Sequence, residues 1–296
     1  MGHGIREVSE HLDSLPMLPG VVTRLLSLDR EDNEYFEKLL PLAQQDPAFA
    51  LRIIRLANSP VFRSYEAIDD LQTAITRVGT YRVAALITSL AVMEIFVPNE
   101  KDARNLWLHS IQVAITARNL AQKSPSVDPS EAYLCGLMHD IGRFVLFSVA
   151  TGDVRSIDES GWETPQQLID VELQVLGINH ADLGWCVCRK WMMPEKVCKV
   201  VQAHHSPDLG SVAASDGPLA GLIRLIQVAD HFSVLLITTA DFGQRTPQGQ
   251  LDLIQDRVMD TVGKGLTVTA GQLQQMAAGV LSESKEQCQA LGLHIR

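Results

Sequence analysis

Apolar residues recur roughly every three to four positions along most of this 296-residue chain, which is the spacing of amphipathic and buried α-helices. No stretch shows the sustained alternation of apolar and polar residues that is typical of β-strands. The pattern therefore predicts an all-α protein. Helices are expected over residues 21–28, 33–40, 48–58, 71–78, 83–98, 103–122, 130–140, 164–176, 180–191, 194–205, 219–239, 250–262 and 270–291.

Prolines, glycines and capping residues mark the boundaries of these helices. Asp46-Pro47 and Thr164-Pro165 each place a capping side chain directly before a proline, which favours the first turn of a helix. Pro41 is expected either to start a new turn or to kink the helix that it interrupts. Residues 206–218 are rich in Ser, Gly and Asp and predict a loop.

The domain organisation follows from one weak boundary near residues 98–103. We expect an N-terminal helical part over residues 1–100 and a helical core over residues 101–240. Residues 241–296 would then add C-terminal helices that pack on the core.

Composition narrows the classes of function. Hydrophobic residues make up 46% of the chain and charged residues 20%, as in an ordinary globular protein. The net charge of -10 and the absence of a basic run argue against a nucleic-acid partner. The five cysteines lie mostly in apolar helical pattern, which favours reduced thiols. Residues 1–7 lack the apolar core of a secretion signal, and residues 219–240 are interrupted by polar side chains. We therefore predict a cytoplasmic protein that does not bind membranes.

Histidines and aspartates supply the candidate chemistry. The dipeptide His139-Asp140 places a nitrogen and an oxygen donor at one point of the backbone, where the carboxylate can bridge two cations. Similar side chains recur on or beside other apolar segments: His109, His180, His204, His205 and Asp230. Burying such groups costs several kcal/mol unless they are hydrogen-bonded or bound to metal. Their convergence would suit two divalent ions that hold a phosphate ester.

Each of these residues also has a purely structural interpretation. His139, Asp140, His109 and Asp230 can be core residues with satisfied hydrogen bonds, and His180 can serve as a cap or first-turn residue. On a continuous helix His204 and His205 would diverge by about 100°, so that one could ligate while the other faces solvent. Arg143 can contact a phosphate group or form an ion pair at a helix end.

The chain resembles the HD superfamily of metal-dependent phosphohydrolases, including its HD-GYP branch, and most closely the HDOD (HD-related output domain) family of bacterial signalling proteins. The resemblance runs from about residue 10 to about residue 240. Segments that carry it are Leu15-Pro16-Met17-Leu18-Pro19, Gln45-Asp46-Pro47, Leu56-Ala57-Asn58-Ser59-Pro60, Ala74-Ile75, Val78-Gly79, Leu106-Trp107-Leu108-His109-Ser110, Gly136-Leu137-Met138-His139-Asp140-Ile141-Gly142-Arg143, Glu172, His180-Ala181-Asp182-Leu183-Gly184, Trp191-Met192-Met193-Pro194 and Ala203-His204-His205.

This resemblance implies an HD-like helical bundle with an N-terminal helical subdomain and a specific set of metal ligands. His109, His139, Asp140 and Asp230 would hold one ion, and Asp140 would bridge to a second ion held by His180, His204 and His205. Iron, manganese, nickel or zinc would suit these donors. Asp140 and Arg143 would be the catalytic residues if the site is active.

The sequence also departs from the phosphodiesterase branch. HD-GYP enzymes place a lysine where this chain has Arg143, and they follow the paired histidines with a Glu and a Gly-Tyr-Pro motif. Here His205 is followed by Ser206-Pro207-Asp208-Leu209-Gly210.

Two hypotheses of different classes therefore remain open. The chain is a signalling module that acts through a protein partner, or it is a metal-dependent phosphohydrolase on a small phosphate ester or nucleotide. Metal analysis would discriminate between them.

Overall fold

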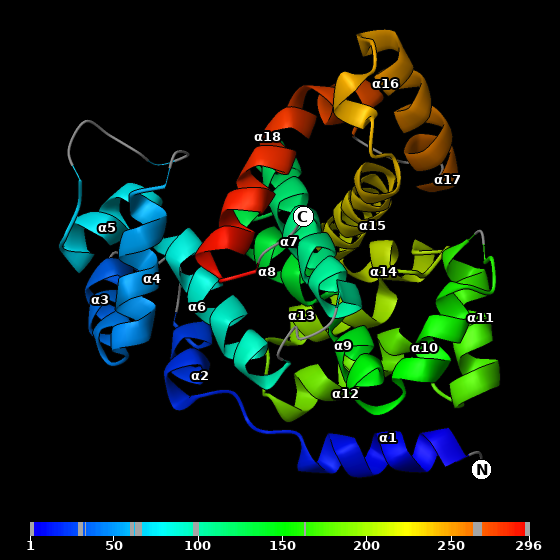
Figure 1. Cartoon of the computed structure of the whole chain (residues 1–296), viewed down its shortest axis with the longest axis horizontal. Helices are drawn as coiled ribbons and strands as arrows, with labels where there is room; N and C mark the ends of the chain where they lie inside the picture. Colours follow the sequence, from blue (N-terminus) through cyan, green and yellow to red (C-terminus); the bar gives the residue numbers. More distant parts are fainter. Residues whose placement is uncertain are drawn as a thin grey trace.

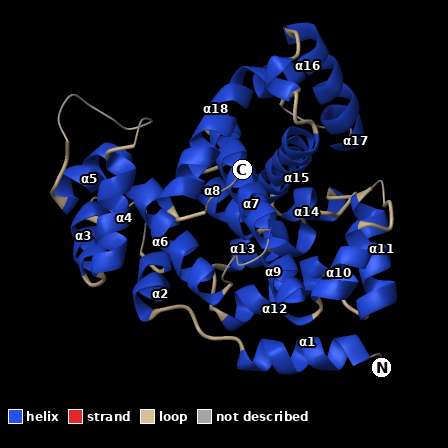
Figure 2. Ribbon diagram, in the orientation of Figure 1, coloured by secondary structure: helices blue, strands red, loops and turns tan. Residues whose placement is uncertain are grey.

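The computed structural model describes residues 3–28, 32, 34–59, 62, 67–96, 101–162, 164–262 and 268–293. Within these ranges the secondary structure is helical and no strand occurs (Figure 2). The prediction of an all-α fold is confirmed. The helices gather around α7 and α8, with smaller groups of helices projecting on either side (Figure 1).

The N-terminal part contributes six helices, drawn in blue and cyan in Figure 1. In chain order these are α1 (His3–Ser14), α2 (Gly20–Leu26), α3 (Tyr35–Gln44), α4 (Pro47–Ala57), α5 (Leu71–Val78) and α6 (Thr80–Ile95). Helices α3, α4 and α5 pack on one another, and α6 joins them to α8 of the core. Helix α1 lies apart from this group and packs against α9 and α11.

The core is built on α7 (Lys101–Ala121), which packs against α8 (Pro129–Met138), α15 (Gly217–Thr238) and α18 (Ala270–Ala290). Between α8 and α15 the chain forms α9 (Ile141–Val149), α10 (Thr151–Asp158), α11 (Pro165–Leu176), α12 (His180–Lys190), α13 (Glu195–Ala203) and α14 (Gly210–Ser215). Helix α12 packs on both α9 and α13. This packing brings the end of α8, the starts of α9 and α12 and the end of α13 close together in the core.

The C-terminal segment leaves the core and returns to it. After α15 come a short 3-10 helix η1 (Phe242–Gln244), α16 (Pro247–Ile254), a π-helical turn η2 (Gln255–Met259) and α17 (Asp260–Val262). Helix α18 then packs along α7 and also contacts α4 and α16. The predicted division at 1–100, 101–240 and 241–296 stays a prediction, because residues 97–100 lie outside the described ranges.

Several helix boundaries differ from those predicted. Helices α1, α9 and α10 were not expected, and the helix predicted over residues 130–140 ends at Met138. Helix α14 interrupts residues 206–218, which were predicted to be a loop. Pro41 lies inside α3, which continues to Gln44. The expected start of one helix at residue 33 and the expected end of another at residue 98 lie outside the described residues. The short helices α10 (8 residues) and α14 (6 residues) escape a search by periodicity because about two turns give too few apolar repeats.

Two apolar segments, Pro129–Val149 and Gly217–Thr238, are long and apolar enough to cross a membrane, judged by length and composition alone. Helices α5 and α6 would pass the same test only as one span bent by 104°. Within the fold 83% of the apolar 18-residue window in the first segment and 72% of that in the second are buried. The second segment is α15, which was predicted to be a buried helix and which packs against α7, α8 and α13.

An ion pair fastens α18 to α7. Both oxygens of Glu283 accept hydrogen bonds of 2.8 Å from Arg118, and both side chains are largely buried. Burial by itself raises the pKa of Glu283, but the hydrogen bonds and charge of Arg118 outweigh it and lower the pKa below the ordinary 4.5. The pair therefore contributes its full stabilisation above about pH 4.5, and this contribution is lost as the pH falls through the lowered pKa of the folded state.

We expect Glu283→Gln to lower the free energy of unfolding by about 3 kcal/mol at pH 7, because it leaves Arg118 buried without a counter-charge. The difference from the wild-type protein should shrink as the pH falls below about 4.5. Urea unfolding at pH 7 and pH 4 measures both effects. A difference that is the same at the two pH values would contradict this account of the pair.

Candidate metal centre

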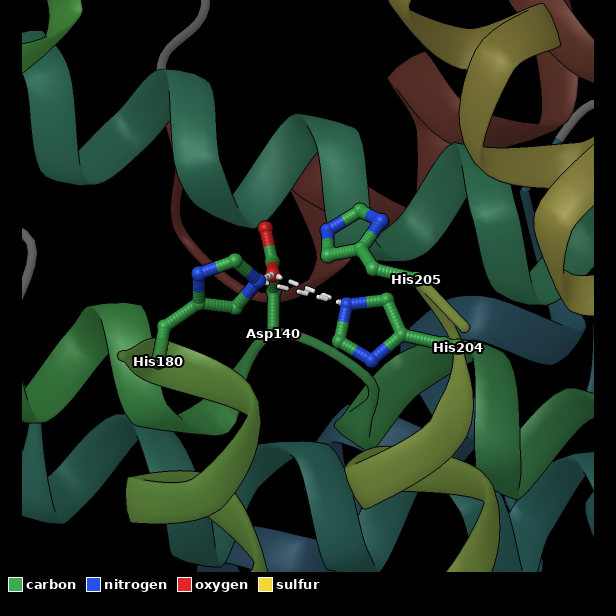
Figure 3. Close-up of side chains that lie close together, drawn as sticks. All are labelled: Asp140, His180, His204 and His205. Atoms are coloured by element: carbon green, nitrogen blue, oxygen red, sulfur yellow. Dashed lines mark hydrogen bonds and ion pairs between the residues drawn. The ribbon is translucent and has the colours of Figure 1, made fainter. Parts of the chain in front are cut away.

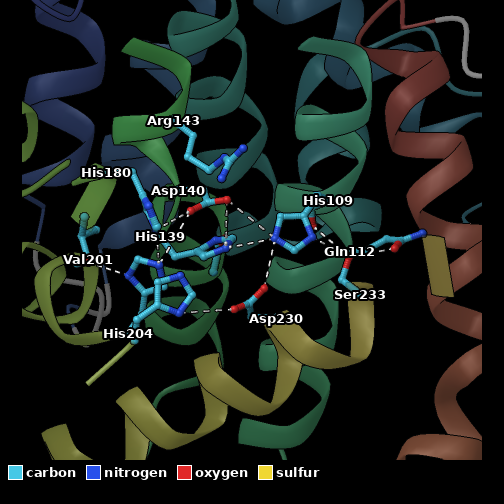
Figure 4. A network of polar contacts seen from close by, with 12 residues as sticks. His109, Gln112, His139, Asp140, Arg143, His180, Val201, His204, Asp230 and Ser233 are labelled. Carbon is cyan, nitrogen blue, oxygen red and sulfur yellow. Dashed lines mark hydrogen bonds and ion pairs between the residues drawn. The ribbon is translucent and has the colours of Figure 1, made fainter. Parts of the chain in front are cut away.

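Seven side chains from five parts of the chain meet in the core. His109 comes from α7, His139 and Asp140 from the break between α8 and α9, and His180 from the first position of α12. His204 and His205 follow α13 directly, and Asp230 lies on α15. Figure 4 shows that His109, His139, Asp140, His180, His204 and Asp230 point toward one another, and Figure 3 shows His205 beside Asp140, His180 and His204. The structure therefore brings together every residue that the sequence analysis selected as a metal ligand, while ligation itself stays a prediction.

A break in the helix orients Asp140. Helix α8 ends at Met138 and α9 begins at Ile141, so His139 and Asp140 occupy the turn between them and do not lie within one helix. Asp140 sits at the N-cap position of α9 with φ -101° and ψ 19°, but its side chain makes no capping hydrogen bond. The carboxylate is thus available to the histidines around it.

Two glycines let the helices approach closely enough to form the cluster. A Cβ atom on Gly142 would overlap the carbonyl oxygen of His180, so only glycine allows α9 to lie against the start of α12. A Cβ atom on Gly136 would lie 2.8 Å from the Cα atom of Ala114 in α7. Both glycines were part of the resemblance in the sequence, and their physical role is this close packing.

Asp140 joins two groups of possible ligands. Its Oδ1 lies 3.4 Å from His180 Nε2 and 3.7 Å from His204 Nε2, while its Oδ2 lies 3.8 Å from the Nε2 atoms of both His109 and His139. In each group, Asp140 with His180, His204 and His205 (Figure 3) and Asp140 with His109 and His139, the candidate ligand atoms all lie within 4.8 Å of one another. One carboxylate oxygen therefore faces each group, as in a carboxylate that bridges two ions.

Asp230 lies at the edge of both groups. Its Oδ1 is 3.2 Å from His109 Nε2, and its Oδ2 is 3.9 Å from His205 Nδ1. The resemblance placed Asp230 with the first ion only, whereas its position is between His109 and His205.

The Nδ1 atoms of the central histidines are already engaged. His139 Nδ1 donates to the carbonyl oxygen of Gly136 at 2.8 Å, and His204 Nδ1 donates to that of Val201 at 2.6 Å. A carbonyl oxygen only accepts, so Nδ1 must carry the proton and the neutral ring turns an Nε2 lone pair toward the cluster. His180 behaves likewise, because its Nδ1 lies 2.6 Å from Glu172 Oε2.

His109 is oriented through a chain of two hydrogen bonds. The hydroxyl of Ser233 donates to Gln112 Oε1 at 2.9 Å and therefore accepts from His109 Nδ1 at 3.0 Å. His109 Nε2 is left to face His139 Nε2 at 3.2 Å and Asp230. The network is drawn in Figure 4.

Burial and mutual charge shift the pKa values of the cluster. Burial lowers the pKa of His139 to about 4, and burial with the charges of His204 and His180 lowers that of His205. Burial alone would raise the pKa of Asp140, but the surrounding histidines, led by His139, hold it well below its ordinary value.

The pKa values of His109 and His180 are raised instead. Burial alone would lower both pKa values, but Asp230 raises that of His109 and Glu172 raises that of His180. The carboxylates of Asp140 and Asp230, whose pKa values are lowered, form an anionic donor set together with the histidine nitrogens.

Arg143 is engaged in ion pairs. Its Nη2 donates to Asp158 Oδ1 at 2.6 Å, and its Nη1 lies 3.6 Å from Glu172 Oε1. Of the two interpretations that the sequence allowed, the geometry contains the ion pair. Arg143 therefore holds Glu172, which in turn orients His180.

The predicted divergence of His204 and His205 does not occur. Helix α13 ends at Ala203, so the two residues lie in a turn and their ring centroids are 4.0 Å apart. Both rings approach His180, with centroids 5.3 Å and 5.0 Å away. The 100° spacing of a continuous helix does not apply to residues beyond its end.

The sequence analysis gave no role to the residues that orient these histidines. Glu172 is 1% exposed and accepts from both the backbone N–H and the Nδ1 of His180. Its only signal was its place in a segment of the resemblance. Ser233 and Gln112 gave no signal at all, because a polar side chain on a buried helix does not reveal its partner.

Comparison with known proteins gives the same picture of the fold. The family model of the HDOD domain matches residues 15–207. An uncharacterized protein of Treponema pallidum is 23% identical over 202 residues, which cover 67% of this chain but only 39% of that protein. The chain therefore spans well under half the length of this relative.

Solved structures share the fold over nearly the whole chain. An HDOD domain protein of unknown function from Geobacter sulfurreducens has a TM-score of 0.71 at 19% identity, covering 97% of this chain and 98% of its own. A protein provisionally called a phosphohydrolase, from Shewanella amazonensis, has a TM-score of 0.71 at 22% identity, with 98% and 100% covered. One provisionally called a signal transduction protein, from Marinobacter aquaeolei, has a TM-score of 0.70 at 21% identity, with 96% and 60% covered.

Proposed function

The chain belongs to the HDOD domain family, and from this premise we propose that it is a signal-transduction module whose HD-type core binds one or two divalent transition-metal ions. The module would act in the cytoplasm through a protein partner. The metal centre is the part of this proposal for which the geometry offers most support.

One observation carries the metal-binding proposal. The Nε2 atoms of His180 and His204 lie 3.3 Å apart, although each ring has its proton on Nδ1. Two lone pairs at this distance repel each other unless a cation or a proton lies between them. A divalent ion removes the repulsion and also neutralises the nearby Asp140.

The donor set suits iron, manganese, nickel or zinc, because imidazole and carboxylate ligands accept all four. His109, His139, Asp140 and Asp230 would hold one ion, and Asp140, His180, His204 and His205 the other. Such ions supply Lewis-acid chemistry toward phosphate oxygens when they are bound. The hydrogen bonds from Nδ1 to Gly136, Val201 and Glu172 keep the rings in place for this purpose.

Three features favour binding and signalling over turnover. His139, His180 and His204 are 0% exposed, and the side chains of His109 and His205 only 12%, so a substrate has little access to the cluster. Arg143, the candidate phosphate contact, is already paired with Asp158 and Glu172. The Gly-Tyr-Pro segment that serves the phosphodiesterases is replaced by Ser206–Gly210.

A metal-dependent phosphohydrolase is the second candidate, and the position of Asp140 favours it. The two oxygens of this carboxylate face separate groups of histidines, as in enzymes that use two bridged ions. A small phosphate ester or nucleotide would be the substrate of such an enzyme.

Metal analysis of the purified protein, expressed in metal-supplemented medium, tests both candidates. We expect at least about one equivalent of a transition metal per chain, because the donors are preorganised. A content below about half an equivalent would refute the metal centre and the hydrolase together.

Turnover of bis(p-nitrophenyl) phosphate then separates the two functions. The signalling proposal expects no nitrophenol release above the metal-free control. Release that is lost in both His139→Ala and Asp140→Ala would instead establish the hydrolase, while release that survives both changes would place the chemistry elsewhere.

A further inference from the structure

A second polar site lies where the N-terminal helices meet the core. A cavity of about 210 Å³ opens between the α5–α6 junction and the facing parts of α7 and α8. It shares no residue with the histidine cluster. Its polar lining comes from Gly79, Arg82, Arg118, Gln122, Ser130 and Tyr133.

Arg82 brings to this cavity a positive charge that the more distant carboxylate of Glu283 only partly offsets. Its guanidinium lies 5.1 Å from the centroid of the Phe62 ring, and within the described part of the chain no carboxylate lies at ion-pair distance from it. Stacking on a ring leaves the in-plane N–H groups available. Arg82 is half-buried, and burial followed by the charge of Arg118 lowers its pKa, so the protein pays for placing it there.

The second guanidinium, that of Arg118, already has a counter-charge. Its guanidinium is hydrogen-bonded to both oxygens of Glu283, and also to Asn119 Oδ1 at 2.8 Å. Glu283 therefore balances one guanidinium, and two line the cavity. One positive charge remains for a ligand.

The start of α6 adds hydrogen-bond donors beside Arg82. Gly79 precedes the helix with φ 93° and ψ 140°, and no side chain caps the first turn. A Cβ atom on Gly79 would meet nothing within 4 Å, so the space in front of the helix end is open. The N–H groups of a first turn have no acceptor within their own helix, and the helix dipole favours an anion there.

We propose that this cavity binds a small phosphate-bearing molecule. The phosphate is held by the fork of Arg82 and by the first-turn N–H groups of α6, with the hydroxyl of Ser130 nearby. The organic part lies against the ring of Tyr133. A cavity of 210 Å³ is below the usual size of a drug-binding pocket, which suits a phosphomonoester with a short organic group.

Such a ligand would connect three parts of the fold. Arg82 belongs to the N-terminal helices, Tyr133 to the core, and Arg118 is joined through Glu283 to α18. Occupancy of the cavity therefore stabilises the arrangement of the N-terminal helices against the core, which is where a regulatory ligand can act. The proposal does not depend on metal bound at the histidine cluster.

Isothermal titration calorimetry of the whole chain with phenyl phosphate and with inorganic phosphate tests this site. We expect Arg82→Gln to weaken binding by about tenfold or more, since a charge-assisted double hydrogen bond is lost. Arg257→Gln, which removes one exposed positive charge from η2, should leave the affinity unchanged. Arg82→Lys keeps the charge but not the fork and should fall between the two.

The proposal is overturned if no binding is seen up to about 10 mM phenyl phosphate, or if Arg82→Gln binds as the wild-type protein does. Equal affinity for benzoate would also overturn it, because the site would then select carboxylates as well as phosphates.

A second measurement needs no variant. Phenylglyoxal modifies accessible arginines, and peptide mass spectrometry can follow Arg82 and Arg257 in the wild-type protein. Phenyl phosphate should slow modification of Arg82 and not of Arg257. Equal rates for Arg82 with and without the ligand would refute the site.

Discussion

Replacement of Asp140 with alanine is expected to remove transition metal from both halves of the histidine cluster. This carboxylate is the only side chain common to the two groups of candidate ligands in the described structure. Its loss also leaves the facing Nε2 atoms of His180 and His204 without the carboxylate that lies beside them. Metal content should fall from one or two equivalents to below about 0.1, which inductively coupled plasma mass spectrometry can measure.

In the presence of metal, the Asp140→Ala variant should melt at a lower temperature than the wild-type protein, because metal bound only by the folded state stabilises that state. Asp256→Ala, on the exposed face of η2, removes an equivalent carboxylate far from the cluster in the chain and serves as the control. His139→Ala should reduce the content of the His109 group alone. Full metal content in the Asp140 variant would show that the histidines bind without a bridging carboxylate.

Glu172→Gln is expected to weaken metal binding in the group of ligands that contains His180, and to destabilise the fold. The carboxylate accepts from the backbone N–H and the Nδ1 of His180 at 2.8 Å and 2.6 Å, and it faces Arg143 at 3.6 Å. An amide carries no charge, so it holds His180 less firmly and leaves Arg143 with Asp158 alone. We expect a 10- to 100-fold loss of affinity for one ion, and a loss of about 3 kcal/mol in the free energy of unfolding.

Titration with zinc in a chelator-buffered series, together with urea unfolding of the metal-free protein, separates these effects. The ion held by His109 and His139 should bind as before, because neither ring contacts Glu172. Glu159→Gln changes an exposed glutamate near α10 and is the matched control. If both ions were bound normally by the Glu172 variant, the orientation of His180 would not depend on this carboxylate.

The positions of the candidate ligands bear on the proposal of a metal-binding signalling module. The histidines are buried and held by hydrogen bonds to the backbone, so they stabilise the junction of α8, α9, α12 and α13 when metal is bound. A substrate would need access that the exposure of these side chains does not provide. In the proposed signalling module the metal centre would therefore serve as a structural support.

Local sequence signals were enough to predict the helical architecture. Thr164-Pro165 predicted the start of a helix over residues 164–176, and the structure has α11 at Pro165–Leu176 with a capping box at Thr164 and a left-handed Gly177 after its end. These signals work because caps and helix periodicity depend on residues a few positions apart. Helices of one or two turns, such as α14, give too few such residues to be found.

The candidate ligands could also be selected from the sequence, because histidine and aspartate are uncommon in apolar helices and need partners when buried. The partners themselves were decided only by the tertiary structure. His109 meets Ser233 across 124 positions, and Arg118 meets Glu283 across 165. Neither spacing follows from any helical repeat, since it depends on how α7 packs against α15 and α18. The tertiary structure also pairs Arg143 with Asp158 and turns the Nε2 atoms of the histidines toward one another. It leaves Arg82 with no carboxylate at ion-pair distance among the described residues.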